Sequence, residues 1–274
     1  MGDFFVSTAE LAATIGTALA PVVNDVRRRA VYDAADRVLP TARWRDHAAS
    51  RTLSTPQAGS IVVYCAHGHN VSQLAAAEWR AAGHDARVLA GGIAAWEAAG
   101  LPTFSKSALP GRDESKPSRW VTRVRPKIDR IACPWLISRF IDREAVFTFV
   151  EPAQVLEVAR ESGAIAYDVE GAPFTHDGPL CSFDTLIRAF GLADPHLDAL
   201  ALIVRGADTA RLDLAPEAAG LLAVSLGVSA LAGGDDHAAL ALGFPVYDAL
   251  YAWHRLAVAE THNWPAKTGA RGSV

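Results

Sequence analysis

The stretch that decides the fold of the first part of the chain is Ile61-Val62-Val63-Tyr64-Cys65-Ala66-His67-Gly68-His69-Asn70-Val71-Ser72. Its apolar start predicts a buried strand, and a helical pattern continues beyond Ser72. Cys65 therefore lies at a strand-to-helix turn, where backbone N–H groups and a helix N-terminus favour a thiolate over a thiol and suit a bound anion. We expect Cys65 to be a reactive cysteine.

Strands and helices alternate on both sides of this turn. Ser7 and Glu10 have the spacing of a capping box and predict the start of a helix, and residues 21–27 predict a strand. A further strand is expected at Ala86–Leu89, before Gly91-Gly92 turns into a short helix that contains Trp96. This alternation predicts an α/β unit with a parallel sheet.

Residues 104–118 lose all periodicity and gather Ser, Pro, Gly and charge, which predicts a linker between domains at 1–103 and 119–274. The second domain is expected to be helix-rich α+β. Its helices are predicted at Pro134–Ile141, Pro152–Glu161, Ser182–Phe190, His196–Val204, Pro216–Ser225 and Phe244–Val258, and its strands at Val146–Val150 and Ala164–Asp168. The tail after Trp264 is expected to fray.

Composition limits the classes of function. The chain has 274 residues, is 50% hydrophobic and carries a net charge of −4, which disfavours general binding to DNA or to an anionic membrane. Three widely spaced cysteines form no disulfide framework and fit a reducing compartment. With no signal peptide and no long uncharged apolar stretch, we expect a cytoplasmic protein.

The segment Val88-Leu89-Ala90-Gly91-Gly92-Ile93-Ala94-Ala95-Trp96 completes a recognisable pattern with Cys65 and with Asn24-Asp25-Val26-Arg27. Together they resemble the rhodanese-like domain, over about residues 4–103. The resemblance implies a rhodanese fold and a sulfurtransferase or a related oxyanion-handling enzyme. Cys65 would carry a persulfide, and the loop of His67, Gly68, His69, Asn70, Val71 and Ser72 would bind the anion.

The loop departs from that family in two ways. Asn70 stands sixth, counting Cys65 as first, where an Arg is common, and the loop is one residue longer than in ordinary sulfurtransferases, a length that goes with phosphatases and arsenate reductases. Charge stabilisation would then fall to the loop amides and to His67 and His69, which are cationic only near or below about pH 6.5. The competing interpretations are solvated histidines and a structural domain with an inert Cys65.

Five cations and one carboxylate occupy residues 119–130 of an otherwise acidic domain. If this segment is extended, Arg123 and Arg125 point to the same face and could grip an oxyanion with their forked donors. We take Arg123, Arg125, Lys127 and Arg130 as a candidate anion site. The alternative is a solvated edge with ion pairs to neighbouring acids.

Two further thiols and a set of metal-capable side chains follow. Pro134 suits the first position of a helix, which would make Cys133 its cap and lower the pKa of that thiol; alternatively Cys133 is buried and inert. Asp168, His176 and Cys181 are candidate metal ligands at irregular spacing, and a polar loop without a metal is the alternative. No cofactor is certain, and a bound metal ion in this domain is the candidate.

Several blocks of the second domain resemble the chromate-resistance domain of ChrB-type proteins, over about residues 119–260. The blocks are Trp120–Asp142, Phe174–Phe183, Arg205–Asp208 and Tyr247–Trp253. The resemblance implies a role in chromate resistance, with chromate, sulfate, thiosulfate or another sulfur donor as the small-molecule partner. One hypothesis is an enzyme that acts through Cys65, and another is a chromate-sensing transcriptional regulator without catalysis. A third, a reductase that uses Cys133 and Cys181, needs their Cα atoms within about 7 Å.

Overall fold

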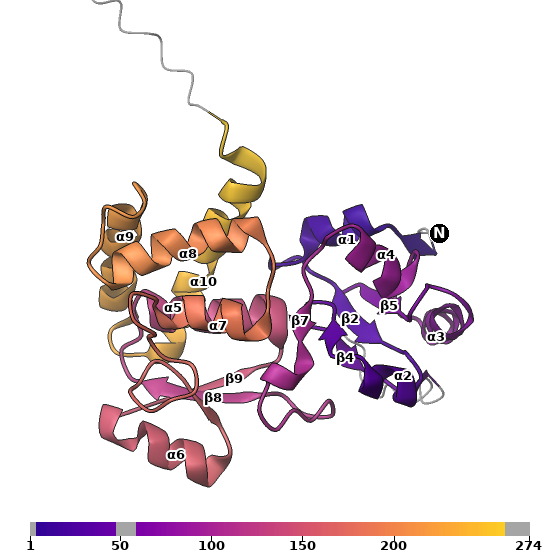
Figure 1. The fold of residues 1–274 in the computed structure, drawn as a ribbon, viewed down its shortest axis with the longest axis horizontal. Helices are drawn as coiled ribbons and strands as arrows, with labels where there is room; N and C mark the ends of the chain where they lie inside the picture. The colour runs from indigo at the N-terminus through magenta and orange to yellow at the C-terminus, as the bar shows by residue number, and fades with distance from the viewer. Residues whose placement is uncertain (1–3, 48–58, 261–274) are drawn as a thin grey trace, which may run out of the picture.

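The computed structural model describes residues 4–47 and 59–260, which form two packed units (Figure 1). The first unit contains a parallel five-stranded sheet in the order β1-β6-β5-β2-β4. The strands are β1 (Phe5–Val6), β2 (Val22–Asp25), β4 (Arg43–Trp44), β5 (Ile61–Tyr64) and β6 (Ala86–Leu89). Its helices are α1 (Thr8–Thr14), α2 (Arg29–Ala34), α3 (Asn70–Ala81) and α4 (Gly92–Ala98). The predicted parallel α/β fold is confirmed.

Alternation along β5 explains why this sheet is covered on both faces. Ile61 and Val63 pack with Trp79 of α3, whereas Val62 and Tyr64 belong to the core that α1 and α4 cover. The capping box expected at Ser7 is present, since its hydroxyl accepts from the Glu10 amide and the Glu10 carboxylate accepts from Ser7. Both the buried strand and the helix start follow directly from the sequence pattern.

The second unit is mostly helical, with a small parallel sheet in the order β10-β8-β9, as the helix-rich α+β prediction requires. Its strands are β8 (Arg119–Arg123), β9 (Val146–Val150) and β10 (Ile165–Ala166). Its helices are α5 (Asp129–Leu136), α6 (Val155–Ser162), α7 (Ser182–Phe190), α8 (Pro195–Asp208), α9 (Ala218–Ala232) and α10 (Asp236–Ala252), with shorter helical turns at η3 (Ile137–Ile141), η4 (Pro152–Gln154) and η5 (Trp253–Ala257). In Figure 1 α6 lies on one side of this sheet and the other helices lie on the opposite side.

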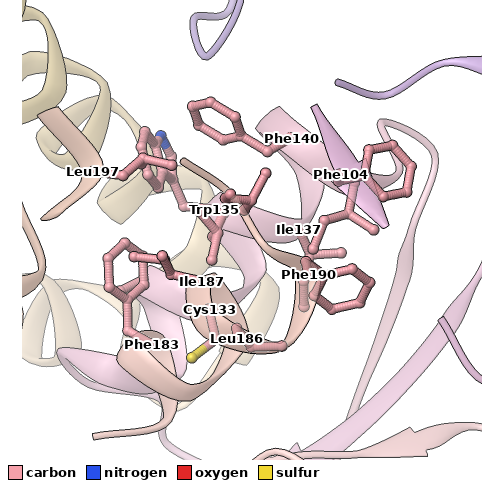
Figure 2. Close-up of a cluster of buried hydrophobic side chains, with 14 of the residues drawn as sticks. Phe104, Cys133, Trp135, Ile137, Phe140, Phe183, Leu186, Ile187, Phe190 and Leu197 are labelled. Carbon is pink, nitrogen blue, oxygen red and sulfur yellow. The ribbon is translucent and has the colours of Figure 1, made fainter. Parts of the chain in front are cut away.

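The start predicted for the first helix of this unit is wrong. The helix α5 begins at Asp129, so Cys133 and Pro134 lie inside it. Proline suits a first helical position, but here it is the sixth residue, where the missing N–H removes one backbone hydrogen bond. Tight packing compensates, because Cys133 and Trp135 are fully buried, as Figure 2 shows for the surrounding side chains.

The segment 104–118 joins the two units and packs against both. Phe104–Ser105 forms β7, which pairs antiparallel with β3 (Arg37–Val38), and Lys106–Ala108 forms the short turn η2. The Phe104 ring lies 6.3 Å from that of Phe190 at the end of α7 (Figure 2). The division into domains at 1–103 and 119–274 stays a prediction, because one hydrophobic core runs through both units.

The predicted frayed tail after Trp264 lies outside the described residues. Among the described helices, none has both the length and the apolar composition needed to cross a membrane.

Candidate functional site

Cys65 follows β5 directly and faces the first turn of α3. Its Sγ lies 3.2 Å from Ser72 Oγ and 3.6 Å from the carbonyl oxygen of His69, which is the cap residue of α3. Burial alone would raise the pKa of the thiol. Hydrogen bonds from the Ser72 hydroxyl and from the backbone N–H groups of His67, Ser72 and His69 outweigh this effect, so the net pKa of Cys65 is lowered. The loop thus favours a thiolate.

Two glycines hold this loop against the start of α4. Gly68 and Gly92 both have positive φ, +71° and +59°. A Cβ on Gly68 would lie 2.6 Å from the Leu89 carbonyl oxygen, and one on Gly92 would lie 2.3 Å from the Cys65 carbonyl oxygen. The amide of Ile93 donates to that same Cys65 oxygen at 3.0 Å. The Gly91-Gly92 segment therefore fixes the backbone that carries the thiol.

The remaining predicted loop residues surround the thiol with different exposure. His67, His69 and Asn70 are exposed, Val71 is half-buried and Ser72 is fully buried. Gln73, a residue that the sequence analysis did not select, donates to the Gly68 carbonyl oxygen at 3.1 Å. The anion-binding role of these side chains stays a prediction.

A second cluster of chemically capable side chains lies in the helical unit. Donor atoms of Asp129, His176 and Asp208 all lie within 4.8 Å of one another, an arrangement that could hold a metal ion. His176 Nε2 is 3.6 Å from Asp129 Oδ2 and 3.3 Å from Asp208 Oδ2. It is also 3.5 Å from Asp168 Oδ1. These residues come from the start of α5, the end of α8 and the segment between β10 and α7.

The cluster brings several carboxylates close to one imidazole, and their charges shift one another's pKa values. Burial and the negative charges of Asp129 and Asp168 raise the pKa of Asp208 to about 7. The hydrogen bond with Asp129 raises the pKa of His176 to about 9, with the nearby carboxylates adding to the effect. A protonated imidazole therefore neutralises part of the carboxylate charge, and a divalent cation would neutralise more.

Backbone and side-chain donors hold the carboxylates in place. Asp129 is 1% exposed and accepts from the amides of Ser182 and Phe183 at the start of α7, at 2.8 and 2.9 Å. Cys133 Sγ donates to Asp129 Oδ1, the oxygen that also accepts from Phe183, at 3.2 Å. Asp168 accepts from the Ser182 hydroxyl at 3.0 Å. Such outer contacts orient potential ligands before any ion arrives.

The four predicted anion-site cations do not converge. The strand β8 ends at Arg123 and Arg125 has φ +57°, so the extended geometry expected to put both on one face is wrong. Arg123 and Arg130 instead both pair with Asp168, at 2.8 and 3.2 Å. Arg125 and Lys127 line a separate pocket of about 300 Å³ that also contains Asp235 and Asp236.

The two further thiols are buried rather than activated. Burial and the charge of Asp129 raise the pKa of Cys133 well above its ordinary value, so the lowered pKa expected for a cap residue is wrong. Cys181 is the residue that caps α7; burial and the charges of Asp129 and Asp184 raise its pKa too. Cys181 donates to Asp184 Oδ2 at 3.3 Å and is not among the clustered metal-capable residues.

The sequence analysis selected His176 and Asp168 but missed Asp129 and Asp208. Both missed acids lie in sequence blocks that resemble the chromate-resistance domain, and this resemblance was the sequence signal that could have identified them. They are 79 residues apart in the chain, so no local spacing marks them as partners.

The fold and these two clusters define a class of protein: a thiol-bearing α/β unit of rhodanese topology joined to a helical unit with an Asp/His cluster. Comparison with known families agrees. Residues 7–99 match the family model of the rhodanese-like domain, and residues 120–254 match that of the ChrB C-terminal domain. The chain therefore carries a rhodanese-like domain followed by a ChrB C-terminal domain.

The chain is also similar to individual proteins. Protein ChrB of Cupriavidus metallidurans is 35% identical over 155 residues, which are 56% of this chain and 46% of that protein, so the match spans less than half of the relative. A rhodanese-related protein of Thermoplasma volcanium is 22% identical, covering 37% of this chain and 97% of its own, with a TM-score of 0.32. Thiosulfate sulfurtransferase of Pseudomonas aeruginosa is 30% identical, covering 36% and 19%, with a TM-score of 0.30.

Proposed function

We propose that this chain is a chromate-resistance protein in which Cys65 accepts and transfers sulfane sulfur. The observation that carries the proposal is the Cys65 thiol with its lowered pKa, held at the first turn of α3 by Ser72 and the loop amides. The ChrB C-terminal domain supports the context of chromate resistance. The rhodanese-like domain supports sulfur chemistry at the matching cysteine.

The chemistry needs only the thiolate and a sulfur donor such as thiosulfate. The Cys65 thiolate attacks the outer sulfur of thiosulfate, the S–S bond of the donor breaks, and sulfite leaves with the bonding electrons. The resulting persulfide anion is stabilised by the same amides that favour the thiolate. Cyanide or a thiolate acceptor then attacks the terminal sulfur, which releases thiocyanate or a new persulfide and restores the Cys65 thiolate.

The direct test is formation of thiocyanate from thiosulfate and cyanide by the purified protein. We expect Cys65→Ala to lose the activity and Cys181→Ser, which changes a buried thiol outside the loop, to retain it. Circular dichroism verifies that both variants fold. Equal rates for the wild type and Cys65→Ala would remove sulfur transfer from the proposal.

We propose further that Asp129, His176 and Asp208 bind a divalent cation. Mixed carboxylate and imidazole donors suit Mn²⁺, Fe²⁺ or Zn²⁺ better than Ca²⁺. The fully buried Tyr167 hydroxyl, next in the chain to Asp168, supports this proposal because it has no hydrogen-bond partner among the described residues. The side of the cluster toward Arg123 and His176 opens into a pocket of about 490 Å³.

Isothermal titration of the metal-free protein with Zn²⁺ and Mn²⁺ tests this second part. We expect one bound ion in the wild type and at least a tenfold weaker affinity in His176→Ala. His84→Ala, in the other unit, is the matched control and should bind like the wild type. Undiminished binding in His176→Ala would place the ion elsewhere, and no binding in the wild type would exclude the site.

A further inference from the structure

A third polar cavity lies between the two units, away from Cys65 and from the Asp/His cluster. It has a volume of about 250 Å³ and lies between the sheet edge at β2 and β4 and the residues just before β9. It is lined by Val22, Val23, Asn24, Thr41, Arg43, Arg45, Arg143 and Glu144. Pockets for drug-sized ligands begin at roughly 300 Å³, so this cavity suits a smaller molecule.

The buried donors of this cavity lack acceptors. Asn24 is 2% exposed, yet its Nδ2 has no hydrogen-bond partner among the described residues. The Nε of Arg45 is likewise buried and without a partner in that part of the chain. An unpaired buried donor costs about 1–3 kcal/mol, so an acceptor bound in this cavity would relieve the cost at two donors at once.

The charged side chains around the cavity also favour binding of an anion. Arg43 is already neutralised, since it pairs with Asp142 at 2.8 Å and with Glu144 at 2.7 Å. Arg45 forms no ion pair among the described residues; burial and then the neighbouring charge of Arg43 lower its pKa, and the charge of Glu144 opposes them. The guanidinium of Arg143 adds a positive charge from the other unit, while one of its nitrogens donates to the Ala20 carbonyl oxygen at 2.7 Å.

We propose that this cavity binds one small oxyanion of the sulfate type, held by Arg45 and Asn24 and closed from the other unit by Arg143. A forked guanidinium and an amide offer several N–H donors to oxygens of one anion, and a cavity of about 250 Å³ is large enough for a tetrahedral oxyanion. Since the donors come from both units, the bound anion also ties them together. The site is separate from the thiol loop and from the Asp/His cluster, so it does not depend on either proposed activity.

Titration calorimetry with sodium sulfate, against sodium chloride at equal ionic strength, tests the site on the full chain. We expect one sulfate per chain, and a rise in the midpoint of thermal unfolding that chloride does not reproduce. Arg45→Gln should weaken sulfate binding at least tenfold and abolish that rise, and Arg45→Lys should retain part of both. Arg211→Gln, which removes an exposed arginine paired with Asp213, should behave like the wild type.

Because Arg45→Lys keeps the charge, it separates loss of the site from loss of folding if Arg45→Gln is unstable. Sulfate binding that survives undiminished in Arg45→Gln, or that is lost equally in Arg211→Gln, contradicts the proposal. The absence of any sulfate effect beyond that of chloride contradicts it too.

Discussion

At the residue scale, the reactivity of Cys65 depends on a few donors rather than on a neighbouring cation. Ser72 is fully buried and bonds both Cys65 Sγ and the His69 carbonyl oxygen. No lysine or arginine occurs between Cys65 and Gln73, so amides and one hydroxyl hold the thiolate. Hydrogen bonds to a charged group are worth roughly 1.5–3 kcal/mol each, enough to set the reactivity of a thiol.

Removing the Ser72 hydroxyl should therefore make Cys65 less reactive. The lowered pKa of Cys65 means that the midpoint of the pH profile of its alkylation rate lies below that of an ordinary thiol. In Ser72→Ala the pKa rises, the rate profile moves to higher pH, and we expect about a tenfold slower rate at pH 7, from the loss of roughly 1.4 kcal/mol. Iodoacetamide kinetics between pH 5 and about pH 10 measure it. An unchanged profile would show that the loop amides suffice alone.

Gly92 offers a second prediction at this scale. Gly92→Ala should destabilise the protein by about 2 kcal/mol more than Gly100→Ala. Both positions have positive φ, but a Cβ on Gly100 meets nothing within 4 Å, whereas one on Gly92 collides with the Cys65 carbonyl. Urea unfolding measures the difference, and equal losses at the two positions would mean that the loop yields easily.

At the scale of elements, the Asp/His cluster connects helices that are distant in the chain. Asp129 opens α5 while its carboxylate accepts from the first amides of α7, and Asp208 ends α8. A cation at this point would bridge α5 and α8 and reach the loop of His176. Metal binding should therefore stabilise this unit by mass action.

We expect saturating Zn²⁺ or Mn²⁺ to raise the midpoint of thermal unfolding by several degrees and a chelator to reverse the rise. Asp208→Asn should lose most of the effect, because it removes one ligand charge at the end of α8. Asp198→Asn, a change in the first turn of the same helix, is the control. A rise of equal size in Asp208→Asn would contradict the assignment.

Helices and strands could be predicted from the sequence where a local pattern of apolar residues and caps defines their ends. The strands β5, β6 and β9 and the helix α7 have the bounds that apolar runs and caps predict. The start of α5 was not predictable, because Pro134 is typical of a first turn and the packing that tolerates it comes from distant segments. The convergence of Asp129 and Asp208 on His176 is likewise a product of tertiary structure, which no spacing in the sequence encodes.

At the scale of the whole molecule, the two units share one core. Gly16, with φ +77°, follows α1, and a Cβ there would lie 2.6 Å from both Phe140 Cζ and Tyr251 Cε1. Arg255 donates to the carbonyl oxygens of Ile15 and Ala12 at 3.0 and 2.7 Å. The hydrophobic core is therefore continuous between the two units, and these contacts join them directly.

We expect the wild type to unfold in one cooperative calorimetric transition. Gly16→Val should lower the midpoint and separate two transitions, since its side chain would collide with Phe140 and Tyr251 of the other unit. Gly83→Val, at another positive-φ glycine with nothing within 4 Å, adds backbone strain alone and should lower the midpoint of a single transition. Two separate transitions already in the wild type would show that the units fold independently.

Mass spectrometry of the thiosulfate-treated protein tests most directly whether Cys65 carries sulfur. We expect the tryptic peptide with Cys65 to gain the mass of one sulfur atom and to lose it on exposure to cyanide, while the peptides with Cys133 and Cys181 stay unmodified. A Cys65 peptide that stays unmodified under conditions where a known sulfurtransferase is loaded would show that this thiol does not carry sulfur.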